Sequence, residues 1–279
     1  MIYQLDPKHS RAKCSVAVGL IITDVDFRKP KSGFSWRVKD LEMESILLKN
    51  EWLETNSLGG YASSTPSGCN TRKYHGLLVT RLADPPGKFV LLSKVEDSLV
   101  FDDREVFLTA HKYPGVLFPR VGLTNQTFSN DCCPTINYDL ENFCIKKEIA
   151  MVNGNNTVLV RYSADENAAS VILRIKPLLA YRDFHHLTRE NLSLRVRTFP
   201  AYEGFVMSPY SGLPSLFCQC NGSFQFFPAP VWYQNFEYEE EKLRGFEYQE
   251  DLFCPGVFEV ALEAGQSVIF SASVEEQKS

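Results

Sequence analysis

The 279-residue sequence has no excess of basic residues and no long hydrophobic run. Its 29 Lys and Arg are outnumbered by 34 Asp and Glu, which gives a formal net charge of −5. Nucleic-acid-binding proteins usually carry a basic surface, so this charge argues against that class of partner. No apolar segment approaches the ~20 residues that a membrane-spanning helix needs. We therefore expect neither nucleic acid nor membrane as a partner.

The cysteine spacing of zinc and redox motifs is also missing. The eight cysteines include no CxxC pair, and Cys218 and Cys254 each follow a phenylalanine. In such apolar surroundings a free cysteine behaves as a small hydrophobic residue. The apolar run 16–22 is short and no cleavage site follows it, which argues against a signal peptide. These features predict reduced thiols in a cytoplasmic protein.

Helical periodicity is nearly absent, and short apolar or alternating segments take its place. The hairpin signal Asn153-Gly154 separates two of them, and residues 39–48 fit either a helix or a strand. The segments expected to form strands are 76–82, 88–94, 157–162, 170–175, 192–197, 257–262 and 267–270. Many strands without intervening helices predict an all-β fold, a large antiparallel β-sandwich with few short helices. We place this sandwich at residues 41–279, after an N-terminal extension at 1–40.

Aromatic residues are plentiful, with 20 Phe, 12 Tyr and 3 Trp, and many fall in one of three segments rich in functional groups. The first segment, 51–76, contains a Gly-Gly pair and ends in a polar cluster, but it lacks the P-loop pattern that holds phosphate. The second, 181–190, places an arginine, an aspartate and two histidines just after a predicted strand. Adjacent histidines on a strand point to opposite faces, so we expect no metal at Asp183, His185 and His186.

The third segment, 231–256, mixes aromatic residues with many carboxylates. Paired carboxylates can perform glycosidic acid–base chemistry when they are held roughly 5–10 Å apart. Two structural alternatives remain open, because Glu239–Glu241 fits a solvated turn and the Glu250-Asp251 pair fits the capping of backbone amides.

Together the three segments resemble a known family. EWLETNSLGGYASSTPSGCNTRKYHGLLV, LLAYRDFHHLTREN and WYQNFEYEEEKLRGFEYQEDLFCPGVFEV are similar to the N-terminal domain of bacterial and archaeal glycogen debranching enzymes of the amylo-α-1,6-glucosidase type. The resemblance runs from about Glu51 to near the C-terminus. Small departures are Ser57, Pro66, Lys73 and Gln234, where the family pattern favours other residues.

The resemblance implies a fold and a role. The family domain is an antiparallel supersandwich that precedes a helical barrel, and that barrel carries the catalytic carboxylates for inverting hydrolysis of α-1,6-linked glucose stubs. No metal or organic cofactor is implied. Because the sequence ends at Ser279, we expect the catalytic barrel to be absent and this chain alone to be inactive. No catalytic residue is therefore assigned.

The resemblance also implies partners and contact residues. The expected partners are an α-glucan, either glycogen or a limit dextrin, and a helical catalytic domain in cis or as a separate chain; self-association through the uncovered face is a further expectation. The candidate substrate-binding residues are Asn70, Arg72, Tyr74, His75, Arg182, Asp183, His185, His186, Trp232, Tyr233 and Glu237.

Other interpretations of the same residues stay open. Arg72 or Arg182 could instead brace the fold by pairing with Asp183 or Glu237, and Trp232 could belong to the core. The chain could also be a stand-alone glucan-binding or scaffolding protein. A third alternative is a self-sufficient enzyme that uses carboxylates from the set Asp183, Glu190, Glu237, Glu250 and Asp251.

Overall fold

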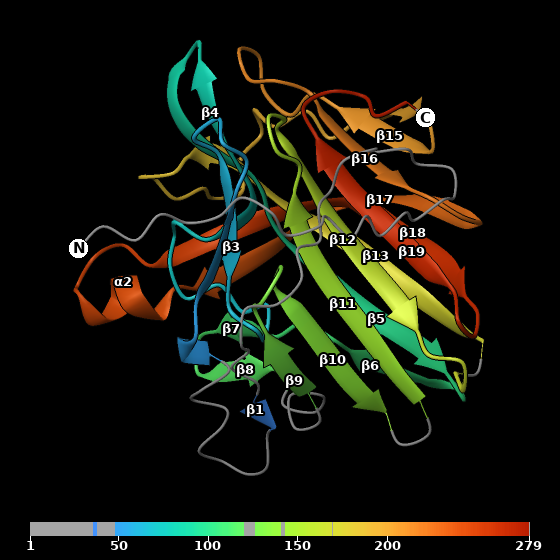
Figure 1. Ribbon diagram of the computed structural model, residues 1–279. Helices are drawn as coiled ribbons and strands as arrows, with labels where there is room; N and C mark the ends of the chain where they lie inside the picture. The colour runs from blue at the N-terminus through green and yellow to red at the C-terminus, as the bar shows by residue number, and fades with distance from the viewer. Residues whose placement is uncertain (1–35, 38–47, 120–125, 141–142, 169, 279) are drawn as a thin grey trace, which may run out of the picture.

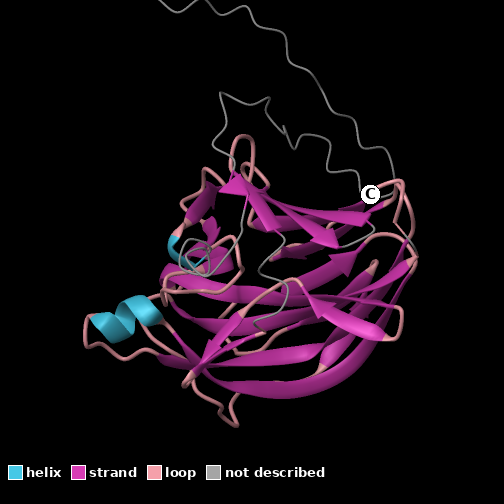
Figure 2. Ribbon diagram, turned by 90° about the horizontal axis from the view of Figure 1, so that it is seen from below, coloured by secondary structure: helices cyan, strands magenta, loops and turns pink. Residues whose placement is uncertain are grey.

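The structure is a computed structural model that describes residues 36–37, 48–119, 126–140, 143–168 and 170–278 (Figure 1). Antiparallel strands form two large sheets and a small hairpin, which confirms the predicted all-β sandwich. Figure 2 shows the strands stacked in layers, with helix α2 (Glu239–Leu243) projecting at one side. None of the helices in the described part of the chain is long and apolar enough to cross a membrane.

The first sheet has nine strands, and consecutive hairpins build one half of it. In spatial order its strands are β1 (Trp36–Arg37), β9 (Gln126–Ser129), β10 (Thr135–Leu140), β11 (Phe143–Met151), β12 (Thr157–Ala164), β19 (Ser267–Ser273), β16 (Leu216–Cys220), β15 (Gly204–Met207) and β14 (Thr198–Ala201). The predicted turn at Asn153-Gly154 joins β11 to β12, and Gly154 has a φ of 74°, which favours glycine.

The second sheet has eight strands and carries all three of the segments singled out in the sequence. Its spatial order is β17 (Phe224–Glu237), β18 (Gln249–Leu262), β13 (Val171–Asp183), β5 (Pro86–Phe101), β4 (Gly76–Ala83), β3 (Tyr61–Ser64) and β2 (Trp52–Thr55), with β6 (Arg104–Phe107) paired to β5. A separate hairpin consists of β7 (His111–Tyr113) and β8 (Val116–Phe118).

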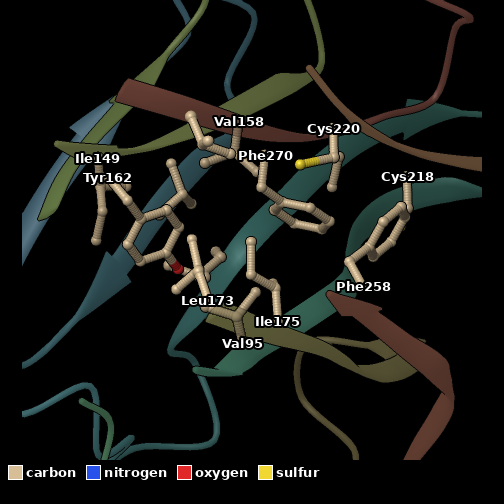
Figure 3. Packing of buried hydrophobic residues seen from close by; sticks show 14 of the residues in the cluster. Val95, Ile149, Val158, Tyr162, Leu173, Ile175, Cys218, Cys220, Phe258 and Phe270 are labelled. Atoms are coloured by element: carbon tan, nitrogen blue, oxygen red, sulfur yellow. The ribbon is translucent and has the colours of Figure 1, made fainter. Parts of the chain in front are cut away.

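The main core fills the space between the two sheets. Val158, Tyr162 and Phe270 come from the nine-stranded sheet and pack with Leu173 and Phe258 of the eight-stranded sheet (Figure 3). All of these side chains are almost fully buried. Alternation along each strand sends every second side chain into this core, which is the pattern expected of a sandwich.

A smaller apolar cluster occupies the opposite face of the eight-stranded sheet. It contains Val79, Val90, Leu178, Leu252 and Phe236, which alternate along their strands with residues of the main core. The hairpin β7–β8 covers part of this face, since the rings of Tyr113 and Phe236 lie 4.9 Å apart. Side chains on this outer face therefore have their own apolar support, and the candidate site is built on it.

Most of the predicted strands are present, but two expectations need comment. Residues 192–197 are not a strand: the Asn191 side chain accepts the Ser193 N–H at 3.1 Å and forms a turn, while Leu192 is fully exposed. The strand predicted at 170–175 continues to Asp183 as β13, so that its end carries Arg182. Residues 1–35 and 38–47 lie outside the described residues. These ranges include most of the predicted extension 1–40 and most of the ambiguous segment 39–48.

Candidate functional site

The three segments meet at one end of the eight-stranded sheet, on its outer face. The loop 71–75 leads into β4, the turn 184–188 follows β13, and α2 lies between β17 and β18. Hydrogen bonds to backbone carbonyls join these elements. The Glu240 N–H donates to the Thr71 carbonyl at 3.0 Å. The Lys73 ammonium donates to the His185 carbonyl at 2.6 Å. The fold thus brings residues that are far apart in the sequence into one cluster.

At the base of the cluster, Arg182 and Glu250 form a buried ion pair with two hydrogen bonds. Arg182 is 6% exposed and Glu250 is 0% exposed. The Nη2 group donates to Glu250 Oε2 at 2.9 Å, Nε donates to Oε1, and Nη2 also donates to the Lys73 carbonyl at 2.7 Å. Burial alone would lower the pKa of Arg182, but the charge of Glu250 outweighs it and raises that pKa.

The remaining bonds of Glu250 tie two more segments to this pair. The Tyr238 hydroxyl donates to Oε2, and the Thr188 N–H donates to Oε1 at 3.0 Å. Its neighbour Asp251 accepts the N–H groups of Glu190 and Asn235 at 2.9 and 2.8 Å. The amide-capping interpretation of Glu250 and Asp251 is therefore confirmed, and the pairing of Arg182 with Asp183 or Glu237 is wrong.

The loop 71–75 is held by carboxylates from outside it. Arg72 Nε lies 2.6 Å from Glu51 Oε1, and its Nη2 lies 3.6 Å from Glu240. Pairing of Arg72 with Asp183 or Glu237 is thus also wrong. His75 is buried and its Nδ1 accepts the Thr71 N–H at 3.2 Å, which leaves Nε2 facing Glu51 at 3.5 Å. Hydrogen bonding to His75 lowers the pKa of Glu51 to about 2.

Two further candidates, Asn70 and Glu237, are buried and fully engaged within the fold. The Asn70 amide donates to the Ser93 carbonyl at 3.1 Å, and its oxygen accepts the Ser64 hydroxyl at 2.7 Å. Glu237 accepts hydrogen bonds from Lys242 of α2 at 3.1 Å and from Gln249 of β18 at 3.2 Å, which ties the end of β17 to both elements. The structure gives both residues a bracing position.

An accessible aromatic surface covers the braced base. The Tyr74 ring meets the Phe184 ring edge-on at 5.4 Å, and Phe184 lies 4.0 Å from the His185 ring, centroid to centroid. The Tyr74 hydroxyl lies 3.4 Å from His185 Nδ1. His185 is exposed, and Tyr74 and Phe184 are partly exposed. We call these three residues the aromatic surface.

The last four candidates lie at the margin of this cluster. Asp183 accepts the His185 N–H at 2.8 Å, which shapes the turn after β13, and His186 is exposed beside it. Trp232 packs edge-on against Phe253 at 5.5 Å, as the core interpretation expected. Tyr233 instead lies on the outer face, where burial raises its pKa. Among the described residues, no ring contact or hydrogen bond joins Trp232 or Tyr233 to the aromatic surface.

The sequence of this chain matches one family over most of its length. Residues 50–269 match the family described as glycogen debranching enzyme N terminal. The chain belongs to this family. No curated protein matches the chain. Among solved structures it resembles a heparan sulfate lyase HepC mutant from Pedobacter heparinus, with 14% identity and a TM-score of 0.35. That likeness covers 63% of this chain and 23% of the lyase chain.

Sequence reasoning missed several residues that organise this debranching-enzyme domain. Glu51 holds the loop 71–75 through Arg72, and Tyr238 bonds Glu250 of the buried pair. Glu241 accepts the Lys73 N–H at 3.0 Å. Glu250 was named only as an amide cap or a catalytic carboxylate. The signal for its burial was its position two residues before the buried Leu252, on the same face of β18. For Phe184, the signal was its place directly before His185 and His186 in the sequence.

The buried carboxylates of the site are engaged within the fold. Each accepts hydrogen bonds from arginine, lysine or backbone N–H groups. Within the described ranges, no group of three His, Cys, Asp or Glu side chains is arranged to hold a metal ion. The accessible groups include the rings of Tyr74 and Phe184, the imidazole of His185 and the exposed carboxylate of Glu190 at the margin.

Proposed function

We propose that this chain is the glucan-contacting N-terminal part of a debranching glycosidase and that the aromatic surface meets the sugar. Family membership supports the first half of the proposal. The observation that carries the second half is the position of Tyr74, Phe184 and His185, which are accessible above a base held by the Arg182–Glu250 pair. Aromatic planes pack on the apolar faces of pyranose rings, while hydroxyl and imidazole groups bond their edges.

The proposed division of labour assigns hydrolysis of α-1,6-linked stubs to a helical catalytic domain, in cis or as a separate chain. This domain would supply a rigid loop cluster to the mouth of that active site. Rigidity matters because binding groups must hold their geometry within a fraction of an ångström to favour one substrate orientation. The bonds from Lys73, Arg182 and Glu250 provide that rigidity here.

Affinity electrophoresis in gels that contain glycogen tests the proposal. The purified chain should migrate more slowly in these gels than in gels without glycogen, and Tyr74→Ala should restore normal migration. Phe199→Ala is the matched control, because Phe199 is an exposed aromatic residue on β14 of the other sheet. Unretarded migration of the unmodified chain would contradict glucan contact by this domain alone.

The same preparation separates the proposal from an autonomous enzyme. Incubation with a branched limit dextrin should release no glucose from the chain alone. Turnover that disappears in Asp183→Asn would assign catalysis to this chain and overturn the division of labour.

A further inference from the structure

Two cations face each other across the hairpin β4–β5, next to the aromatic surface. Arg81 of β4 and Lys88 of β5 are directly paired in the antiparallel register, so their side chains leave the same face of the sheet. This is the outer face, since Val79 and Val90, each two residues away along the same strands, belong to the outer apolar cluster. Like charges that lie directly opposite each other destabilise a sheet, so a bound anion would relieve this repulsion.

Neither cation has a carboxylate partner in the described part of the chain. Arg81 is exposed and Lys88 is partly exposed, and no ion pair or hydrogen bond joins either side chain to a described residue. Asp84, at the tip of the same hairpin, is exposed and pairs with neither of them. Asp183 lies opposite Phe89 in the register, and therefore on the face that Lys88 does not share. The two positive charges are thus available to a ligand.

Lys88 connects this pair of cations to the aromatic surface. Its Nζ lies 5.9 Å from the centroid of the Phe184 ring and 5.3 Å from that of the Tyr61 ring. The Tyr61 hydroxyl donates to the Tyr74 carbonyl at 2.7 Å, which ties the Tyr61 ring to the same cluster. An ammonium group therefore lies within reach of a substituent on a sugar that packs against the aromatic surface.

A third cation borders the aromatic surface at the Tyr74 ring. The Lys73 ammonium lies 5.4 Å from the centroid of that ring and donates to the His185 carbonyl, and no ion pair joins it to a described carboxylate. The chain as a whole has a formal net charge of −5, so this positive charge is a local feature. A neutral glucan offers only hydroxyl groups to it, whereas an anionic glucan also offers a counter-charge.

The chemistry of the two opposed cations favours a phosphate monoester over a carboxylate. A guanidinium donates two parallel hydrogen bonds to phosphate oxygens, and an ammonium acts as a point charge beside them. A phosphate monoester carries about two negative charges near pH 7 and can balance both cations, while one carboxylate balances a single cation. Sugar hydroxyls are the positions at which such esters form.

We propose that the glucan that meets the aromatic surface carries phosphate monoesters and that Arg81 and Lys88 bind one of them. This inference rests on the proposed function, because it takes glucan contact by the aromatic surface as given. The phosphate neutralises the opposed cations of β4 and β5, while the sugar that bears it packs against the neighbouring rings.

Affinity electrophoresis of the purified chain in two gels tests the site, one with amylopectin and one with the same amylopectin after chemical phosphorylation. The gels have equal ionic strength, since salt screens exposed charges. Apparent affinity should be about tenfold higher for the phosphorylated polymer, as expected for a charge-assisted hydrogen bond. Lys88→Gln should remove most of this difference, and Lys88→Glu should reverse it, because a carboxylate repels the phosphate.

Arg197→Gln is the matched control, because Arg197 is also an exposed cation beside an aromatic ring. Its guanidinium lies 4.7 Å from the centroid of the Phe199 ring, at β14 of the other sheet. Arg197→Gln and Lys88→Gln change the net charge of the chain equally, so a general attraction to the phosphorylated polymer would affect both variants alike. Arg197→Gln should keep the full difference between the two gels.

The outcomes separate this inference from the proposed function. Retardation that is equal in the two gels would overturn the phosphate site and leave glucan contact supported. No retardation in either gel would overturn both. Inorganic phosphate, added at the concentration of the esters, should compete only weakly because it lacks the sugar. Complete loss of the difference would show that the cations bind a free anion, which would overturn recognition of a phosphorylated glucan.

Discussion

Arg182 and Glu250 are joined by two hydrogen bonds in the interior of the candidate site, and neither side chain has appreciable contact with solvent. The pair also receives the Tyr238 hydroxyl and the Thr188 N–H, and it holds the Lys73 carbonyl. Five residues from all three segments therefore share one electrostatic centre. The aromatic surface depends on this centre for its position, although neither charged residue is part of that surface.

Removal of one charge from this pair should be strongly destabilising. Glu250→Gln leaves the Arg182 guanidinium buried without a counter-charge, and breaking a buried pair in this way costs about 3–5 kcal/mol. Urea unfolding monitored by tryptophan fluorescence measures the loss.

The control lies between the same two strands. Arg174 and Glu259 pair across β13 and β18 at 2.8 Å, but both side chains are about one-third exposed. Glu259→Gln should therefore change the free energy of unfolding by about 1 kcal/mol or less. Equal effects of Glu250→Gln and Glu259→Gln would show that the buried pair is not the centre of the site.

Acidification should destabilise the fold through His111 and Glu96 on the outer face. Their side chains lie 2.9 Å apart, and Glu96 also bonds Lys176. Burial lowers the pKa of His111 to about 4, below its ordinary value of 6.5. The unfolded chain therefore binds a proton at His111 more readily than the folded chain does. The contribution of His111 to the free energy of unfolding is complete above pH 6.5 and is lost as the pH falls toward 4.

Glu96 acts in the same direction at lower pH. Burial alone would raise its pKa, but His111 and Lys176 outweigh burial and hold the pKa below its ordinary value. The contribution of Glu96 to the free energy of unfolding is therefore present above the unfolded pKa of 4.5 and is lost as the pH falls below it. Each of the two groups can change the free energy of unfolding by at most about 1.4 kcal/mol per pH unit.

Urea midpoints measured from pH 8 to pH 4 check this dependence. His111→Gln should flatten the decline between pH 6.5 and 4, whereas His185→Gln, at an exposed ring, should keep the slope of the unmodified chain. A slope that is identical in all three proteins would exclude His111 as the group responsible.

The sequence was sufficient for the architecture and for the segments of the site, but not for their bonds. Alternating runs have a period of two, and short apolar runs bounded by turn residues are typical of buried strands, so both patterns predict strands. The failure at 192–197 came from the Asn191 side chain, which favours a turn over the strand that Leu192 and Leu194 suggested. Local hydrogen bonding of this kind competes with strand pairing and does not appear in a hydrophobic pattern.

Ion-pair partners could not be predicted because they depend on strand order. From the sequence alone, a pair of Arg182 with Asp183 or Glu237 was one open alternative, yet its partner is Glu250 on β18, the strand that pairs with β13. Pairing between strands about 70 residues apart is a property of the sheet, and charge patterns along the chain carry no information about it. The same holds for Arg72 and Glu51.

Cysteine alkylation should be selective in the folded protein. Cys144 is exposed, whereas Cys218 and Cys220 are buried in the main core, where burial raises their thiol pKa values. Because the thiolate is the reactive form, iodoacetamide at pH 8 should modify Cys144 and spare the two core thiols. Peptide mass spectrometry gives the extent at each site, with labelling in urea as the control; equal labelling of Cys144 and Cys218 in the native protein would contradict the core.

Ser57 occupies a backbone conformation that suits glycine. Its φ is 63°, and the side chain is exposed in the turn between β2 and β3. The turn is organised by the neighbouring Asn56, whose side-chain oxygen accepts the N–H groups of Leu58 and Gly60 at 3.0 Å each.

Ser57→Gly should therefore relieve strain without the loss of a bond, and we expect a gain of about 0.5–1 kcal/mol in the free energy of unfolding. Ser57→Ala is the control, because alanine keeps the Cβ that opposes a positive φ, and it should give no gain. Chemical unfolding of the three proteins side by side measures the difference. A loss of stability in Ser57→Gly would mean that the greater flexibility of glycine in the unfolded chain outweighs the strain at this turn.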